Sequence, residues 1–318
     1  MSRSTLMHLL GIRAPLICAP MGGVAGGQLA SDVSHAGGLG MIGMGSTGSA
    51  ESLRQQLAHV ATSTNVGIGM VDWVTRRHPD MLELALGASP ALLSVCFGET
   101  FEWAARAKDA GIPTAVQVAD VSEARAADRA GIDILVARGR EGGGHGKPLH
   151  DRDALLAQVL EVTDRPVLAA GAIATRDDVT RVMAAGASGV WVGTAFIAAD
   201  EALSSPAYRR TVLKARAEDT VVTRVFDRAA GHRWPPDIPE RVVANEFTAR
   251  WSDGPDFDRE SAHAEFARAN AADDPRAMSI NAGMGVGHVT STCGAAEIVD
   301  TLMGASAHSD RGQDHAGR

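Results

Sequence analysis

The amino-acid sequence predicts a single (β/α)8 TIM barrel with a helical lobe inserted before its last helix. Up to residue 196, eight short apolar or β-rich segments alternate with helix-like segments, and such alternation is typical of a parallel sheet. The chain of 318 residues exceeds a mean domain but suits one α/β barrel with an elaboration, because such a barrel commonly needs about 250 residues. Hydrophobic residues make up 45% of the chain and charged residues 21%, so we expect a globular protein with a full core.

Helical segments separate the eight predicted strands. Ala-Gly pairs end three of these helices at Gly111, Gly131 and Gly186, where a glycine at the C′ position adopts the left-handed conformation. A doubly wound sheet would show the same alternation, usually with about five to seven strands, so eight units favour the closed barrel. The predicted strands are residues 16–21, 38–43, 65–71, 92–98, 114–118, 132–139, 166–173 and 189–196. The predicted helices between them are clearest at residues 51–60, 101–110, 122–130, 152–162 and 176–185.

The pattern changes after the eighth predicted strand. Residues 203–278 contain the proline-punctuated phrase HRWPPDIPE and the charged phrase WSDGPDFDRE, and we predict that they form a helical lobe before the last helix. The barrel would then comprise residues 1–202 and 279–304, and the lobe would overhang its mouth and shape a substrate cavity. The tail at residues 305–318 is rich in His, Asp and Gly, and we expect it to be disordered.

Charge and cysteine content narrow the class of partner. The net charge of −8 provides no large basic surface for a nucleic-acid backbone, so the expected partner is a small-molecule substrate. Cys18, Cys96 and Cys293 form no C-x-x-C pair, so neither a metal site nor a redox couple is predicted. The first twenty residues lack a continuous apolar region, and no stretch of about 20 apolar residues occurs. We expect a cytoplasmic protein without membrane contact; its oligomeric state stays open, with a homodimer as one alternative.

Two glycine turns predict a phosphate site. The phrases PVLAAGAI (166–173) and GVWVGTAF (189–196) each combine a strand with a glycine turn, at the seventh and eighth barrel positions. Glycine lets the backbone approach an oxyanion closely, and the following helix start supplies free N–H groups. The alternative is that these glycines only close tight turns. The location and the pairing of the two turns favour the phosphate site.

The phrase GREGGGHGK (139–147), which follows the sixth predicted strand, points to catalysis. Three consecutive glycines do not stabilise a helix or a sheet, and they allow a chain to pass close to a flat ligand. His145 would then project into the barrel mouth. An imidazole that titrates near neutrality is suited to removing a weakly acidic proton from a substrate carbon, so we expect His145 to be catalytic.

Two further features at strand ends are compatible with a planar ligand. The phrase APMGG (19–23) ends the first strand, and its backbone either lies along a flat ring or forms a small-residue turn; spacing alone does not decide between these alternatives. Gln117 is a lone amide at the end of the fifth strand in an otherwise apolar neighbourhood. A buried ligand heteroatom would satisfy its hydrogen-bonding groups.

Together these segments resemble the nitronate monooxygenase family, formerly called 2-nitropropane dioxygenases and related to FMN-dependent enoyl-acyl-carrier-protein reductases. The likeness covers nearly the whole barrel. It is carried by the phrases PLICAPMGGVAGGQLASDVSHAGGLGMIG, VQVADVSEARAADRAGIDILVARGREGGGHG, PVLAAGAI with GVWVGTAF, and the closing GAAEIVDTL.

The resemblance implies FMN as the cofactor and His145 as the residue that deprotonates neutral nitroalkanes or orients the anionic nitronate. It implies oxidation of alkyl nitronates with O2 to carbonyl compounds and nitrite. The backbone around the first strand's end and the glycine loop, together with one amide, would hold the flavin: Ala19, Pro20, Met21, Gly22, Gln117, Gly143 and Gly144. The two glycine turns would hold its phosphate: Gly171, Ala172, Val192, Gly193 and Thr194.

Four positions depart from the family pattern. Gly69 stands where many members carry Asn, Arg138 where Gln is usual, Ala172 where a second Gly is common and Trp191 where Gln is often seen. Arg138 is the most consequential. A fixed cation beside the flavin would stabilise its reduced anion or bind an anionic substrate, so we assign Arg138 to the cofactor site.

The sequence therefore predicts an FMN-dependent oxidoreductase of nitronate monooxygenase type, acting on a nitronate or a similar anion with O2. One alternative is an NAD(P)H-dependent flavin reductase of enoyl thioesters or quinones on the same scaffold. Another is a flavin-binding barrel without catalytic activity. These alternatives stay open because barrels change their reactions by altering loops.

Overall fold

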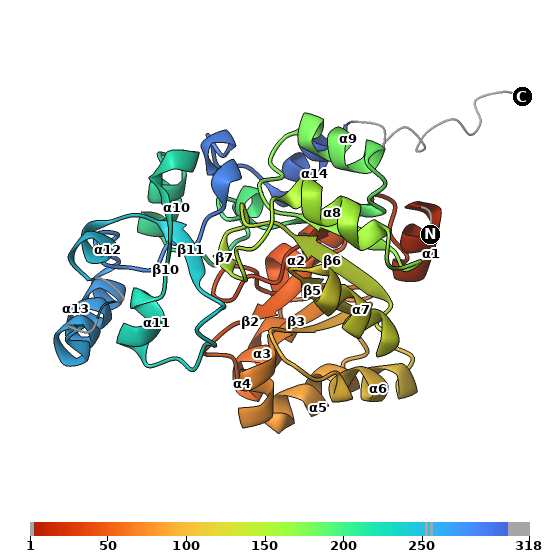
Figure 1. The fold of residues 1–318 in the computed structure, drawn as a ribbon, viewed down its shortest axis with the longest axis horizontal. Coiled ribbons are helices and arrows are strands. Elements are labelled where there is room, and N and C mark those ends of the chain that lie inside the picture. The colour runs from red at the N-terminus through yellow and green to blue at the C-terminus, as the bar shows by residue number, and fades with distance from the viewer. Residues whose placement is uncertain (1–2, 252–253, 255–256, 305–318) are drawn as a thin grey trace, which may run out of the picture.

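The computed structural model describes residues 3–251, 254 and 257–304, and its centre is the predicted barrel (Figure 1). Eight parallel strands form one sheet in the order β1-β9-β8-β6-β5-β4-β3-β2. Each lies within or close to a predicted strand, so the fold prediction is confirmed. The strands are β1 (Leu16–Cys18), β2 (Met41–Met44), β3 (Gly67–Val71), β4 (Leu92–Cys96), β5 (Thr114–Val118), β6 (Ile134–Arg138), β8 (Val167–Ala170) and β9 (Gly189–Val192).

A single residue before β2 closes the sheet into a barrel. Leu39 forms a parallel bridge with Ile17 of β1. Its N–H donates to the carbonyl of Leu16, and its carbonyl accepts from the N–H of Cys18, both at 2.9 Å. The first and last strands of the sheet order are thereby joined, and no free edge remains between them.

Helices surround the barrel and bury its outer face. Glycines in the left-handed region follow the helices at Gly111, Gly131 and Gly186, as the Ala-Gly pairs predict. Among the described residues, every helix is too short or too polar to cross a bilayer. The barrel helices are α1 (Arg3–Leu10), α2 (Gly27–His35), α3 (Ala50–Leu57), α4 (Asp72–Arg77), α5 (Pro79–Gly87), α6 (Glu102–Asp109), α7 (Val121–Arg129), α8 (Arg152–Leu160), α9 (Arg176–Ala184) and α14 (Ala295–Met303).

Strand alternation decides which side chains enter the barrel. Ile134 and Val136 of β6 belong to an inner apolar cluster together with Leu6 and Leu10 of α1, so α1 plugs one end of the barrel. The alternate residues of the strands pack outward against the helices. The same alternation directs the last residue of β6, Arg138, inward at the carboxyl-terminal mouth. Gln117 of β5 is in the equivalent position, two residues after the inward Ala115.

The segment 203–278 lies to one side of the barrel, opposite α1 in Figure 1. It contains the helices expected from the sequence, but also two strands that were not predicted. The first of these strands, β10, pairs with the second, β11, and β11 also pairs with the two-residue strand β7 (Gly144–His145), which lies in the glycine-rich loop 139–147. The segment contains α10 (Pro206–Val212), β10 (Thr220–Thr223), α11 (Val225–Ala230), β11 (Glu240–Val243), α12 (Glu246–Arg250) and α13 (Arg259–Ala272). The predicted tail at 305–318 lies outside the described residues.

Candidate active site

A cavity of about 370 Å³ opens at the carboxyl-terminal ends of the strands, between the barrel and the segment 203–278. Barrel enzymes place their active sites at this end. Every residue predicted for the site lines this one cavity, although the role of each remains a proposal. These residues are Ala19, Pro20, Met21, Gly22, Gln117, Arg138, Gly143, Gly144, His145, Gly171, Ala172, Val192, Gly193 and Thr194.

The two glycine turns lie side by side on the cavity wall. β8 and β9 are hydrogen-bonded neighbours, so the turns that follow them open on the same edge. Gly171 and Ala172 both have positive φ, +108° and +49°, and the buried Arg152 guanidinium donates to both of their carbonyl oxygens at 3.0 and 3.3 Å. The carbonyls are thereby turned away from the cavity. This arrangement leaves backbone N–H groups available to an anion, as the phosphate prediction requires.

Gln117 has the unsatisfied group that the sequence predicts. Its side-chain Oε1 is buried, and it accepts no hydrogen bond from any described residue. A buried unpaired acceptor costs free energy unless a partner satisfies it. A ligand with an N–H donor would supply that partner, because Gln117 lines the cavity.

Arg138 holds the glycine-rich loop in place. Its Nη2 donates to the carbonyl oxygens of Gly142, Gly143 and Gly144 at 2.9, 3.0 and 3.0 Å. A side chain at Gly142 or Gly146 would collide with this guanidinium, which explains two of the glycines in the loop. Burial lowers the pKa of Arg138 to about 10, and the nearby Arg241 adds to this effect, so the group stays charged at neutral pH. Within the described ranges, no carboxylate forms an ion pair with it.

The departure at Gly69 has a steric reason. A Cβ at this position, in the middle of β3, would collide with the Pro20 ring. The Asn that many family members carry there therefore does not fit this backbone. Trp191, which stands where Gln is often seen in the family, is 4% exposed and belongs to the inner apolar cluster.

His145 is fixed by contacts with the segment 203–278. β7 pairs antiparallel with β11, which sets His145 opposite Glu240. The Nε2 of His145 lies 2.9 Å from Oδ2 of Asp227, and its ring stacks on Trp234 with centroids 3.6 Å apart and an interplanar angle of 7°. Trp234 is itself held by a hydrogen bond from its Nε1 to the hydroxyl of Ser46. The imidazole therefore has one defined orientation in the cavity wall.

The ionisation of His145 and Asp227 follows from burial and pairing. Burial lowers the pKa of His145, and although Asp227 acts in the opposite direction, the net shift is downward. Burial alone would raise the pKa of Asp227, but hydrogen bonding with His145 and His232 lowers it overall. A neutral imidazole beside an ionised carboxylate is the state that agrees with both directions.

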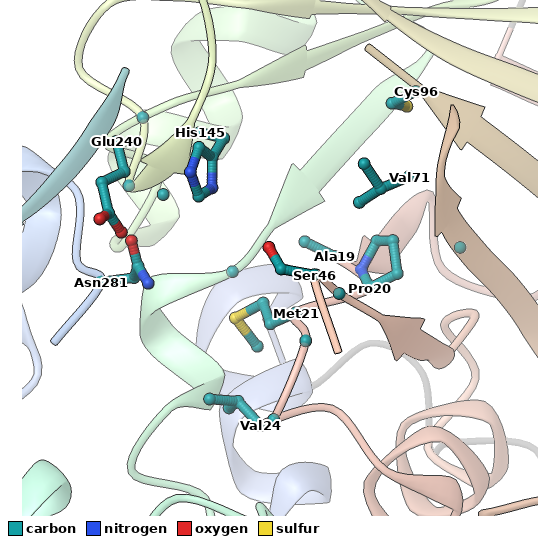
Figure 2. Close-up of a pocket in the computed structure, with 18 of the residues that line it drawn as sticks. Ala19, Pro20, Met21, Val24, Ser46, Val71, Cys96, His145, Glu240 and Asn281 are labelled. Atoms are coloured by element: carbon teal, nitrogen blue, oxygen red, sulfur yellow. The ribbon is translucent and has the colours of Figure 1, made fainter. Parts of the chain in front are cut away.

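Glu240 is a second buried carboxyl group in the same wall. It is 2% exposed, and burial together with the nearby Asp227 charge raises its pKa to about 8. Figure 2 shows its carboxyl end directed at the side chain of Asn281, on the side of the pocket occupied by His145. Neither Oε1 of Glu240 nor Oδ1 of Asn281 accepts a hydrogen bond from the described residues. A proton on Oε1 of Glu240 would let this oxygen donate to Oδ1 of Asn281, so one hydrogen bond would satisfy both atoms.

Four residues of the site were not predicted from the sequence: Asp227, His232, Trp234 and Glu240. Three of these four belong to the phrase HRWPPDIPE, whose tryptophan and prolines were interpreted only as a change in the chain pattern. Their approach to His145 depends on the pairing of β7 with β11, a contact between segments about 95 residues apart that no local pattern predicts. The clustering of His, Trp and Glu beside prolines in this phrase is the sequence signal that could have indicated site residues.

A family comparison decides the class of protein. The sequence model of the family described as nitronate monooxygenase matches residues 3–81 and 78–304. The chain belongs to the nitronate monooxygenase family. It is accordingly an enzyme, an oxidoreductase, and the resemblance noted from the sequence is confirmed.

Relatives of this nitronate monooxygenase family member carry more than one activity in their names. The nitronate monooxygenase of Paraburkholderia phytofirmans is 29% identical over 299 residues, which covers 79% of each chain. The 5-hydroxy-7a-methyl-1-oxo-octahydro-1H-indene-4-carboxyl-CoA dehydrogenase of Rhodococcus jostii is 29% identical over 246 residues, covering 77% of this chain and 67% of its own. The solved structure of FabK from Thermotoga maritima has a TM-score of 0.82 at 27% identity and covers 94% of both chains.

The substitution Glu240→Gln tests the buried neutral carboxyl group. Because folding raises the pKa of Glu240 from 4.5 to about 8, the unfolded state loses its proton first as pH rises, and wild-type stability falls between those values. Glutamine carries no charge, so the free energy of unfolding of the variant relative to wild type should increase from pH 5 to pH 8. Urea unfolding measures this difference. The exposed Glu83→Gln serves as the control and should show no such increase; a constant difference for Glu240→Gln would contradict the assignment.

Proposed function

We propose that this enzyme is an FMN-dependent oxidoreductase that oxidises alkyl nitronates with O2 to carbonyl compounds and nitrite. The observation that carries the proposal is the unpaired, buried Oε1 of Gln117, which lines the same cavity as the two glycine turns and His145. One cavity thus offers an acceptor for a ring N–H, backbone for an anion and a positioned imidazole. The family membership supports the same reaction class.

The residues of the cavity fit FMN. The backbone of 19–22, the glycines Gly143 and Gly144 and the amide of Gln117 would hold the flavin ring, whose N–H can satisfy the unpaired amide oxygen. The turns at 171–172 and 192–194 would hold the phosphate. When bound, FMN supplies the redox chemistry, because side chains alone provide no electron acceptor of this kind.

Charge in the cavity suits an anionic substrate. The Arg138 guanidinium is buried and donates to three carbonyl groups, and among the described residues no ion pair neutralises its positive charge. In a low-dielectric site such a charge stabilises a neighbouring anion. A nitronate or a reduced anionic flavin would gain from the same charge.

A second candidate function is supported by the apolar side of the cavity. Aromatic side chains from the barrel and from the segment 203–278 line it, namely Phe97, Phe226, Trp234 and Phe266. This aromatic wall is larger than the contact surface of a small nitronate. The relative from Rhodococcus jostii is named for a bulky CoA thioester. A flavin reductase or dehydrogenase of thioesters, using NADH or NADPH, is therefore the alternative.

Anaerobic stopped-flow absorbance distinguishes these functions. The purified protein, loaded with FMN, is mixed separately with propyl-2-nitronate, NADH and NADPH. Loss of oxidised flavin absorbance with the nitronate alone is the expected result. Bleaching by a nicotinamide alone would assign the enzyme to the reductases, and no response to any of the three would contradict both assignments.

The substitution His145→Ala tests the proton transfer. FMN should stay bound, and turnover of neutral nitroalkanes should fall by roughly 10²- to 10⁴-fold, the usual contribution of a positioned base. Turnover of pre-formed nitronates should fall much less, because they have already lost the proton. Steady-state oxygen consumption measures both rates. Equal losses on the two substrates would argue against a role as base.

The pair Arg138→Gln and Arg138→Lys tests the buried cation. Removing the charge should lower the midpoint potential of the bound flavin, by on the order of 30 mV, which corresponds to about 1.4 kcal/mol for a two-electron couple. The lysine variant keeps the charge and serves as the matched control. Spectroelectrochemical titration measures the potential, and an unchanged value in Arg138→Gln would refute this role.

A further inference from the structure

We propose that Asp227 is a positioning residue that holds His145 with its proton on Nε2, so that Nδ1 is the base and the substrates include neutral carbon acids. A neutral carbon acid here means a compound with an acidic C–H beside a nitro group or a thioester carbonyl. This inference rests on the proposed function and specifies which atom performs its proton transfer.

Asp227 and His145 are held in a defined geometry. Asp227 is 6% exposed, and its Oδ2 lies 2.9 Å from Nε2 of His145. Stacking on Trp234 prevents the imidazole from tilting out of this contact. Asp227 belongs to α11, whereas His145 belongs to β7, so the pair joins the segment 203–278 to the glycine-rich loop.

The contact with Asp227 also identifies the basic nitrogen of His145. A carboxylate facing Nε2 favours the tautomer with hydrogen on Nε2, because that N–H can donate to it. The His145 ring contacts Asp227 through Nε2, and the ring lines the cavity. The nitrogen left to accept a proton is therefore Nδ1. This is the arrangement in which an acidic residue orients a catalytic histidine in other enzymes.

Charged and titratable groups surround the pair of His145 and Asp227. Arg138 and His232 act against protonation of His145, and Asp227 acts for it. The second oxygen of Asp227, Oδ1, lies 3.6 Å from Nδ1 of His232, so two imidazoles share one carboxylate. Glu240 completes the group. One side-chain nitrogen of His145 and one carboxyl oxygen each of Asp227 and Glu240 lie within 4.8 Å of one another. With Glu240 uncharged, Asp227 carries the negative charge that stabilises the imidazolium formed in the reaction.

The proton transfer balances without further reactants. The substrate C–H bond breaks, its proton forms an N–H bond at Nδ1, and the electron pair stays on the substrate, delocalised into the nitro group or the thioester carbonyl. His145 becomes an imidazolium, and Asp227 stays ionised. For a nitroalkane, the anion then present in the cavity is the nitronate whose oxidation the proposed function describes.

The isosteric substitution Asp227→Asn tests the proposal, with Asp237→Asn as the control. Asp237 is on the same segment, but its side chain is 62% exposed and pairs with Lys147. In Asp227→Asn, kcat/KM for neutral nitroethane should fall roughly 10²- to 10⁴-fold, and turnover of ethyl nitronate should change little. The control should match wild type on both substrates. Equal losses on both substrates, or no loss on either, would overturn the proposal.

A second readout does not depend on turnover. In ¹⁵N-histidine-labelled holoprotein, the Nδ1 signal of His145, assigned with His145→Gln, should have the shift of an unprotonated ring nitrogen, and Asp227→Asn should move it toward a tautomer mixture. A protonated Nδ1 in the wild type would overturn the proposal even if nitronate is a substrate. The predicted spectrum without any activity on nitro compounds would instead contradict the proposed function alone. Activity that is lost on chelation and restored by a divalent cation would assign His145, Asp227 and Glu240 to a metal site. That result would also overturn the proposed pairing of Asp227 with His145 as a base.

Discussion

Alternation along the strands of a closed barrel is the constraint on which the site depends. Every second side chain points inward. Closure of the barrel through Leu39 fixes which side chains face the interior and which face the helices. Below the mouth the inward positions carry large apolar side chains such as Ile134, Leu168 and Trp191, which fill the interior. At the mouth the same positions carry Gly69, Gln117 and other small or polar residues. The change from large to small residues creates the cavity floor.

The segment 203–278 turns this cavity into a candidate active site. The barrel supplies the glycine turns, Gln117 and Arg138, whereas the segment supplies the partners of His145, namely Asp227, Trp234 and Glu240. The imidazole is thus positioned by residues that are remote in sequence. Differences in such a segment would change substrates while the barrel keeps its ligand, which agrees with the several activities named among the relatives.

The sequence predicts the barrel well because its signals are local. Strand periodicity, glycine helix ends and the paired turns at Gly171 and Gly193 each depend on short stretches of chain. The residues predicted for the site meet in one cavity for the same reason, since parallel strands bring their carboxyl ends to one edge. The pairing of β7 with β11 could not be predicted, because it joins a two-residue strand to a distant one. The contacts of His145 with Asp227 and Glu240 depend on that pairing.

Binding of FMN compared with riboflavin tests the central claim most directly. The two ligands share the flavin ring, and FMN alone carries the phosphate that the glycine turns are proposed to hold. Fluorescence titration of flavin-free protein measures both affinities under identical conditions. We expect stoichiometric binding of FMN and far weaker binding of riboflavin. Equal affinity for the two would contradict the phosphate site, and absence of FMN binding would contradict the assignment as a flavoenzyme.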